Sequence, residues 1–191
     1  MSSTDDKKAI SKSCDSRGCL CDIIFILQYA AANRNIVRTT DMHVINIFDS
    51  NRQAHWLEEI RRSDWSAGAF LADLISKGTF FDAVGEASKV LLLTEGDELI
   101  SYCTFAEKDD IQPTDLTPWM GFVYTFPEHR GHRCVGKLFE EIERIAKKDG
   151  ISEVYLSTNH IGLYEKYGCE FKTLMNDMDG VPSRVYVKRI H

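Results

Sequence analysis

The sequence of 191 residues lacks the compositional extremes that mark several protein classes. Four prolines and twelve glycines are too few for a collagen-like or low-complexity chain. Six cysteines are far below the density of a small secreted domain held by disulfides, which favours a reducing, cytoplasmic setting. Cys14, Cys19 and Cys21 lack the C-x-x-C spacing and second ligand pair of a structural zinc site, so no metal is expected.

Long hydrophobic runs and an excess of positive charge are also missing. The run Ile23 to Leu27 is far shorter than the roughly 20 residues that span a bilayer, and the acidic residues around it disfavour a signal peptide. Lys and Arg number 23 against 29 Asp and Glu, a net charge of −6, whereas coating nucleic acid requires a cationic surface. We therefore expect no membrane and no nucleic-acid partner, and cationic partners are favoured instead.

The remaining composition, 43% hydrophobic and 27% charged, is that of a folded protein with about one domain. Residues 1–41 carry no regular pattern and are predicted to be an N-terminal appendage, for which disorder is one alternative. Met42 stands just before the first strand-like run, so an upstream-extended reading frame is another explanation of the appendage. Residues 42–191 are predicted to form the functional domain.

Hydrophobic spacing in residues 42–191 predicts mixed strands and helices. Strands are predicted at residues 43–48, 90–93, 99–105, 119–125, 154–157, 171–174 and 184–188. Helices are predicted from a cap at Asp49 or Ser50 through Ile60, from Ser66 to a stop at Gly78, from Val135 to Gly150, and at 162–167. On the third helix, Glu140 with Arg144 and Glu143 with Lys147 are predicted as i,i+4 pairs. This pattern predicts an α+β fold whose mixed, mostly antiparallel sheet includes a parallel strand–helix–strand unit at 119–157.

The segment from Phe126 to Leu138 is the most informative part of the chain. Its Arg, His and Gly residues lead from a strand into a helix start, where free N–H groups and the helix dipole make a generic anion or pyrophosphate site. A solvated strand-to-helix connection is the alternative. Gly136-Lys137 is followed by Leu138, and no G-x-G-x-x-G follows a strand, so neither a P-loop nor a dinucleotide fingerprint is present.

Two segments carry a resemblance to a known family. The first is Val123-Tyr124-Thr125-Phe126-Pro127 followed by Arg130-Gly131-His132, and the second is Gly162-Leu163-Tyr164-Glu165-Lys166-Tyr167-Gly168. Together with the order of elements over residues 43–191, they resemble the GCN5-related N-acetyltransferase (GNAT) family, whose second motif reads L-Y-x-K-x-G-F. The resemblance implies a GNAT-like fold with a β-α-β cofactor-binding unit, and acetyl-CoA as cosubstrate.

The resemblance also implies where acetyl-CoA binds. Its pantetheine arm is expected along the backbone of Phe122, Val123 and Tyr124, beside a bulge marked by Gly121. The remaining loop candidates for cofactor binding are Arg130, Gly131, His132, Arg133, Cys134, Val135 and Gly136. The family loop reads R/Q-x-x-G-x-G/A, so Arg133 and Val135 replace its two small residues. A residue without a Cβ lets the backbone approach a diphosphate closely, so the side chains of Arg133 and Val135 should weaken this contact. Arg133 can itself bind a phosphate.

Candidates for proton transfer follow from the same resemblance and from amine chemistry. Tyr164 matches the family tyrosine that protonates the departing thiolate, and a packing tyrosine is the alternative. An amine with a Lys-like pKa of ~10.4 is only ~0.1% neutral near pH 7.4, so a base must take its proton. His160 is the first choice, because its ordinary pKa lies nearest neutrality, and Glu107 and Glu128 are further candidates. Asn159 is a cofactor-binding candidate, with a helix cap as its alternative role.

Two acidic pairs, one cysteine and two tryptophan-bearing helices carry weaker signals. Asp109-Asp110 and Asp177 with Asp179 are predicted as solvated loops, with a cation-attracting mouth as the alternative. Cys134 is predicted to pack rather than react. The helices that carry Trp56 and Trp65 are predicted to supply core and one wall of an acceptor pocket.

We therefore expect an N-acetyltransferase that transfers acetyl to a primary amine by direct attack in a ternary complex. The acceptor stays open between a small polyamine-like, aminoglycoside-like or amino-acid amine and a protein amine. A homodimer is left open. The rival hypotheses are a non-catalytic acyl-CoA-binding or sensor domain and a structural interaction domain without cofactor.

Overall fold

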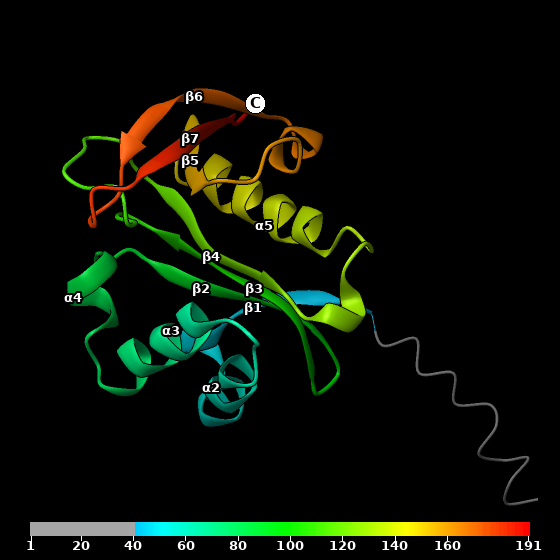
Figure 1. Cartoon of the computed structure of the whole chain (residues 1–191). Coiled ribbons are helices and arrows are strands. Elements are labelled where there is room, and N and C mark those ends of the chain that lie inside the picture. The colour runs from blue at the N-terminus through cyan, green and yellow to red at the C-terminus, as the bar shows by residue number, and fades with distance from the viewer. Residues whose placement is uncertain (1–40) are drawn as a thin grey trace, which may run out of the picture. The chain divides into compact units, whose positions relative to one another are not determined.

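The computed structural model describes residues 41–191, and a mixed sheet of seven strands in the order β1-β2-β3-β4-β5-β7-β6 forms its centre (Figure 1). The strands are β1 (His43–Asn46), β2 (Lys89–Glu95), β3 (Glu98–Ala106), β4 (Trp119–Thr125), β5 (Glu153–Thr158), β6 (Cys169–Asn176) and β7 (Pro182–Arg189). Only β4 and β5 run parallel, which confirms the predicted mixed, mostly antiparallel sheet. The predictions for residues 1–40, including those for Cys14, Cys19 and Cys21, lie outside the described residues.

Helices cover both faces of the sheet (Figure 1). One face carries α2 (Gln53–Arg61), α3 (Ser66–Ser76) and α4 (Phe80–Val84), and the other carries α5 (Cys134–Lys148). Three short 3-10 turns, η2 (Ile47–Asp49), η3 (Pro127–His129) and η4 (Tyr164–Tyr167), join the elements. Within residues 41–191, no helix has the length and apolar character needed to cross a membrane.

The central strands are buried from both sides, which explains their continuous hydrophobic runs. In β2, Leu91 and Leu93 belong to the core beneath α5, whereas Val90 and Leu92 belong to the core beneath α2, α3 and α4. Side chains alternate between the faces of a strand, so four consecutive apolar residues fill two cores. The same alternation places Tyr102 of β3 on the α2–α4 face.

The sheet splits between β4 and β5. Their only registered pair is Trp119 with Tyr155, next to a bond from the Tyr155 N–H to the Pro118 carbonyl (2.9 Å). From there β1–β4 and β5–β7 diverge (Figure 1). Trp119 and Tyr155 belong to a third core with Ile111, below the loop 107–118. The pairing confirms the predicted parallel unit and leaves the rest of the β4 edge unpaired by strands.

A β-bulge interrupts β4 just before the split becomes wide. Tyr102 pairs with Tyr124 and Thr104 pairs with Gly121, so Phe122 and Val123 both stand opposite Cys103. Phe122 has a φ of 48°, which is unusual for a residue with a side chain. The bulge predicted at Gly121 is thus confirmed, and Phe122, the next residue along the chain, is its extra residue.

Several local predictions were wrong at element ends. The first strand stops at Asn46 because residues 47–49 turn into η2. Helix α2 begins at Gln53 without a side-chain cap, since the Ser50 hydroxyl instead accepts bonds from the Arg52 N–H and the Trp56 indole (both 3.1 Å). Of the helix predicted at 162–167, only the turn Tyr164–Tyr167 forms, and the short helix α4 was not predicted.

The predicted ion pairs on α5 are replaced by others. Arg144 binds Glu141, three residues earlier, instead of Glu140. Glu143 pairs at 2.9 Å with Lys188 of β7 instead of Lys147. Sequence spacing on one helix therefore did not determine these contacts, because a tertiary partner and a closer neighbour were available.

Candidate active site

The basic loop between η3 and α5 exposes a row of backbone N–H groups. Residues 131–135 have no main-chain acceptor for their amides within residues 41–191. Gly131 has a φ of 85°, and Arg133 adopts the left-handed conformation (φ 59°, ψ 28°) as the N-cap of α5. Gly131, His132, Arg133 and Lys137 are exposed. The loop thus combines free donors, positive charge and the positive end of a 15-residue helix, as an anion site requires.

Arg130 directs its guanidinium away from these amides. Its Nε donates to the Thr125 carbonyl (3.0 Å), its NH2 lies 3.4 Å from the Asp64 carboxylate, and its guanidinium lies over the ring of Tyr124. A hydrogen bond from Tyr124, followed by Arg130, lowers the pKa of Asp64. Arg130 therefore ties the end of β4 to the α2–α3 connection, and its side chain does not point into the loop.

The β5-facing edge of β4 is open at the bulge. The Tyr124 carbonyl accepts a bond from the Ser101 hydroxyl (2.6 Å), and the Phe126 N–H donates to the Ile100 carbonyl, so both groups face β3. Because backbone groups alternate along a strand, those of Val123 face the split. Asn159 and His160 follow the C-terminal end of β5, at the same edge of the sheet as the basic loop.

Tyr164 reaches the bulge from the α5 face. Its ring belongs to the core beneath α5, 6.3 Å from that of Phe139 and in the same cluster as Cys103, the residue opposite the bulge. Its hydroxyl has no hydrogen-bond partner within residues 41–191. Burial, and then the neighbouring Cys103 and Cys169, raise the pKa of Tyr164. The phenol therefore keeps its proton at neutral pH and is available as a donor.

Of the predicted bases, Glu107 lies apart from the bulge. Ala106 pairs with Trp119, so Glu107 lies near the start of β4, roughly 10 Å in strand rise from Gly121. Its carboxylate accepts a bond from the Ala87 N–H (2.8 Å). His160 is exposed, and its backbone N–H donates to the Thr158 hydroxyl (3.1 Å).

Glu128 is also exposed, on η3, and lies beside Glu98 and His129. None of the three predicted bases forms a side-chain hydrogen bond or ion pair with Tyr164 within residues 41–191.

Asp109 lies at the bulge, although the sequence did not predict it as a catalytic or cofactor-binding residue. A Cβ atom on Gly121 would lie 3.0 Å from both carboxylate oxygens of Asp109 and 3.0 Å from the Thr104 hydroxyl. Asp109 is half-buried, so its prediction as a solvated loop residue was wrong. Burial, and then Asp110, raise the pKa of Asp109 to about 7. No short motif marks this residue, because it reaches β4 only through the fold of loop 107–118.

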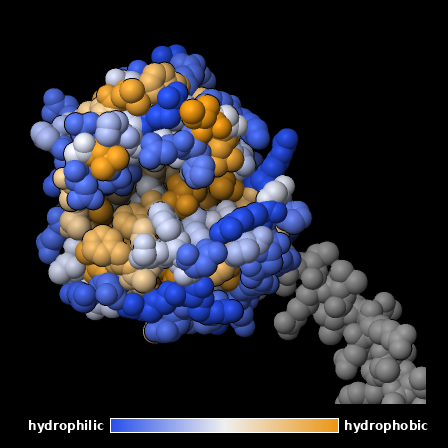
Figure 2. Space-filling model, viewed as in Figure 1, coloured by the Kyte–Doolittle hydropathy of each residue, from blue (hydrophilic) through white to orange (hydrophobic). Residues whose placement is uncertain are grey.

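Aromatic side chains border the α2–α4 side of the bulge. The Phe122 ring lies 6.3 Å from that of Trp65 and 6.4 Å from that of Phe70. Trp56 is buried in the core, as predicted, whereas Trp65 is 38% exposed. Figure 2 shows a hollow between the two halves of the molecule with hydrophobic side chains on its floor.

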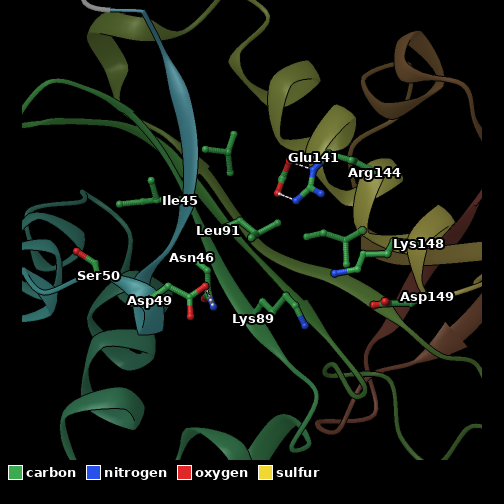
Figure 3. Close-up of a pocket in the computed structure, with 12 residues that line it drawn as sticks. Ile45, Asn46, Asp49, Ser50, Lys89, Leu91, Glu141, Arg144, Lys148 and Asp149 are labelled. Atoms are coloured by element: carbon green, nitrogen blue, oxygen red, sulfur yellow. Dashed lines mark hydrogen bonds and ion pairs between the residues drawn. The ribbon is translucent and has the colours of Figure 1, made fainter.

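A separate pocket of about 550 Å³ opens between β1, β2 and the C-terminal half of α5 (Figure 3). In its wall, Arg144 is bound to Glu141 by hydrogen bonds of 2.7 and 2.8 Å. Arg144 lies roughly 15 Å along the helix from Cys134, at 1.5 Å per residue. None of the predicted site residues lines this pocket, which therefore lies apart from the basic loop.

The comparison with protein families decides the identity of this arrangement. The acetyltransferase (GNAT) family profile matches residues 50–169, more than half of the chain. The chain belongs to the GNAT acetyltransferase family. The matched range contains β4 with its bulge, the basic loop, α5 and Tyr164. A search of curated proteins found no match.

Solved GNAT structures share the fold. The GNAT family N-acetyltransferase YhbS from Escherichia coli, crystallised with CoA, has a TM-score of 0.59 and 20% identity, covering 80% of this chain and 83% of its own. The aminoglycoside 6'-N-acetyltransferase from Enterococcus faecium has a TM-score of 0.57 and 14% identity, covering 78% of this chain and 98% of its own. At these identities the likeness concerns the fold.

The described residues fit acetyl-CoA, the cosubstrate of the GNAT family. The free amides at 131–135 match a diphosphate, and the open backbone of Val123 matches the amides of a pantetheine arm. Cys134 is buried, and burial raises the pKa of its thiol, which confirms its packing role. Gly136 lets α5 approach η4, because a Cβ there would lie 3.2 Å from the ring of Tyr167.

Replacing Arg133 by glycine should stabilise this GNAT domain. A left-handed residue with a Cβ costs roughly 1–2 kcal/mol, and the flexibility of glycine costs about 0.5–1 kcal/mol. We expect a net gain of about 0.5–1 kcal/mol, which is a rise of about 1–4 °C in Tm by calorimetry. Arg133→Ala is the matched control, since it removes the same charge but keeps the Cβ. Equal Tm values for the two variants would contradict the argument.

Proposed function

We propose that this chain transfers an acetyl group from acetyl-CoA to a primary amine by direct attack within a ternary complex, in a domain of residues 42–191. The observation that carries the proposal is the open, bulged edge of β4, which lies between the amides of the basic loop and the hydroxyl of Tyr164. A domain that only binds acyl-CoA requires the open edge of β4 and the amides of the basic loop, but it does not require the hydroxyl of Tyr164.

The residues have separate roles in this proposal. The amides of residues 131–135 bind the diphosphate, and the bulge at Phe122 and Val123 aligns the pantetheine arm, with Val123 offering its free backbone groups. The backbone of Tyr124, also predicted to bind this arm, faces β3 instead. When bound, acetyl-CoA supplies an acetyl group activated as a thioester. Tyr164 donates its phenolic proton to the departing sulfur, and its raised pKa keeps that proton in place until the transfer.

The acceptor side lies on the α2–α4 face. Trp65, Phe70 and Phe122 form a wall suited to the carbon skeleton of a small amine. The net charge of −6 favours a cationic acceptor over an anionic one. A structural neighbour is named an aminoglycoside 6'-N-acetyltransferase, which supports a small-molecule amine as the acceptor. We favour a small-molecule acceptor and a cytoplasmic location, for which the free, buried Cys103, Cys134 and Cys169 are suited.

Thermal unfolding in the presence of acetyl-CoA tests the cofactor site. A ligand at 100 times its Kd stabilises the native state by ~2.7 kcal/mol, so Tm should rise by roughly 5–10 °C. Free CoA should act similarly, whereas ATP, which lacks the pantetheine arm, should not. No shift at millimolar acetyl-CoA would refute the acetyltransferase proposal.

A further inference from the structure

We propose that Asp109 is the catalytic base of this protein and takes the proton from the attacking amine. This inference rests on the acetyltransferase function proposed above. Its foundation is the position of Asp109, whose two carboxylate oxygens lie against the surface of Gly121, directly before the bulge residues Phe122 and Val123. Glycine at this position is what lets a carboxylate from another segment lie on β4, because a Cβ would compete for the same space.

Asp109 and Tyr164 approach the bulge from opposite faces of the sheet. Thr104, which shares the space above Gly121 with Asp109, alternates with Cys103 and Phe105, and both of these belong to the core beneath α5. Asp109 therefore lies on the α2–α4 face, whereas Tyr164 lies with Cys103 on the α5 face. A base on one side and an acid on the other suit a displacement in which the amine enters on one face and the sulfur departs on the other.

The backbone N–H of Asp110 is the hydrogen-bond donor that acts on the carboxylate of Asp109, and no basic side chain neutralises this carboxylate within residues 41–191. It makes no ion pair with any Lys, Arg or His within residues 41–191. The charged group that acts on it is Asp110 of its own loop, and Asp177 from the β6–β7 connection acts on Asp110 in turn. From β3 and β4, Thr104 and Gly121 lie beside it, and neither carries a charge.

The proposed step is balanced without a further reactant. The amine nitrogen bonds to the acetyl carbonyl carbon, and the bond from that carbon to sulfur breaks. The proton lost by nitrogen passes to a carboxylate oxygen of Asp109, and the sulfur takes the proton of the Tyr164 hydroxyl. Asp109 returns its proton to solvent and Tyr164 regains one, so the products are the amide and the free thiol. An amine that arrives as an ammonium ion first releases one more proton to solvent.

The pKa of about 7 suits this role and makes the test specific. The share of neutral amine already falls about tenfold per pH unit below the amine pKa. Below about pH 7 Asp109 is also protonated and cannot accept a proton, so log(kcat/KM) should fall more steeply there. The same shift predicts that the contribution of Asp109 to folding stability declines between pH 3.8 and 7, because the folded state disfavours the ionised carboxylate. Asp109→Asn should therefore not lower Tm near pH 8. If the carboxylate only held the fold together, the same substitution would lower Tm.

The experiment measures thiol release from acetyl-CoA between pH 5.5 and 9, with spermidine, an aminoglycoside and a lysine-containing peptide as acceptor probes. For the acetylated probe, Asp109→Asn should lower kcat by about 100-fold or more and remove the steeper fall of kcat/KM below pH 7, with an unchanged Tm shift by acetyl-CoA. Asp110→Asn, the exposed neighbouring carboxylate, is the control and should stay within about threefold of the wild-type kcat.

The outcomes separate the two proposals. A wild-type protein that binds acetyl-CoA and acetylates a probe, together with an Asp109→Asn variant of similar kcat and an identical pH profile, would overturn the role of Asp109 alone. A wild-type profile of log(kcat/KM) that does not become steeper near pH 7 would do the same without any variant. A wild-type protein that neither shifts in Tm with acetyl-CoA nor acetylates any probe would refute the proposed function itself.

Discussion

Tyr164→Phe should lower kcat by about 100-fold and leave acetyl-CoA affinity within about threefold. The reason is that the variant loses only the hydroxyl, which has no hydrogen-bond partner within residues 41–191, while the ring keeps its place against Phe139. Steady-state thiol release and a binding titration with acetyl-CoA measure the two quantities. Tm should be unchanged, because no bond within the described part of the protein is broken.

Tyr167→Phe provides the matched control for this experiment. Tyr167 lies three residues further along η4 and stacks on the same Phe139 ring, with a centroid distance of 5.6 Å. Its hydroxyl is not assigned a role, so the variant should turn over at the wild-type rate. If Tyr164→Phe also retained the wild-type kcat, Tyr164 would be a packing residue and an acyl-CoA-binding role would gain support.

Trp119→Ala should cost about 3–5 kcal/mol of unfolding free energy, the largest effect expected from one substitution outside the catalytic groups. Trp119 is fully buried, and it pairs with Tyr155 at the one point where β4 and β5 meet. Its indole N–H donates to the Leu116 carbonyl (2.7 Å), in the loop that carries Asp109. The variant therefore loses packing in the third core and leaves the carbonyl without its donor.

Chemical denaturation and calorimetry measure this effect, and a decrease of about 10 °C or more in Tm is expected for a domain of this size. Trp65→Ala is the control, because Trp65 is 38% exposed and should cost about 1 kcal/mol or less. Comparable losses in the two variants would show that the junction of β4 and β5 does not hold the two halves of the sheet together.

Local sequence patterns were sufficient for most elements. Strands β2, β3 and β4 and helices α3 and α5 lie where hydrophobic spacing predicted them, because each buries a face whose period is visible in the sequence. The predictions failed where a tertiary contact competed with a local rule. Ser50 bonds to Arg52 and Trp56 instead of capping a helix, and Glu143 pairs with Lys188 of a distant strand.

The sequence by itself determined the fold class, the family resemblance, the basic loop and the matching tyrosine, because each depends on residues that are close together along the chain. Only the tertiary structure decided which carboxylate meets the bulge. The sequence favoured His160 and Glu107 by their chemistry, whereas the structure brings Asp109 onto Gly121. The physical reason is that the path of loop 107–118, which Trp119 anchors, sets the distance between Asp109 and Gly121. No local spacing in the sequence encodes that path.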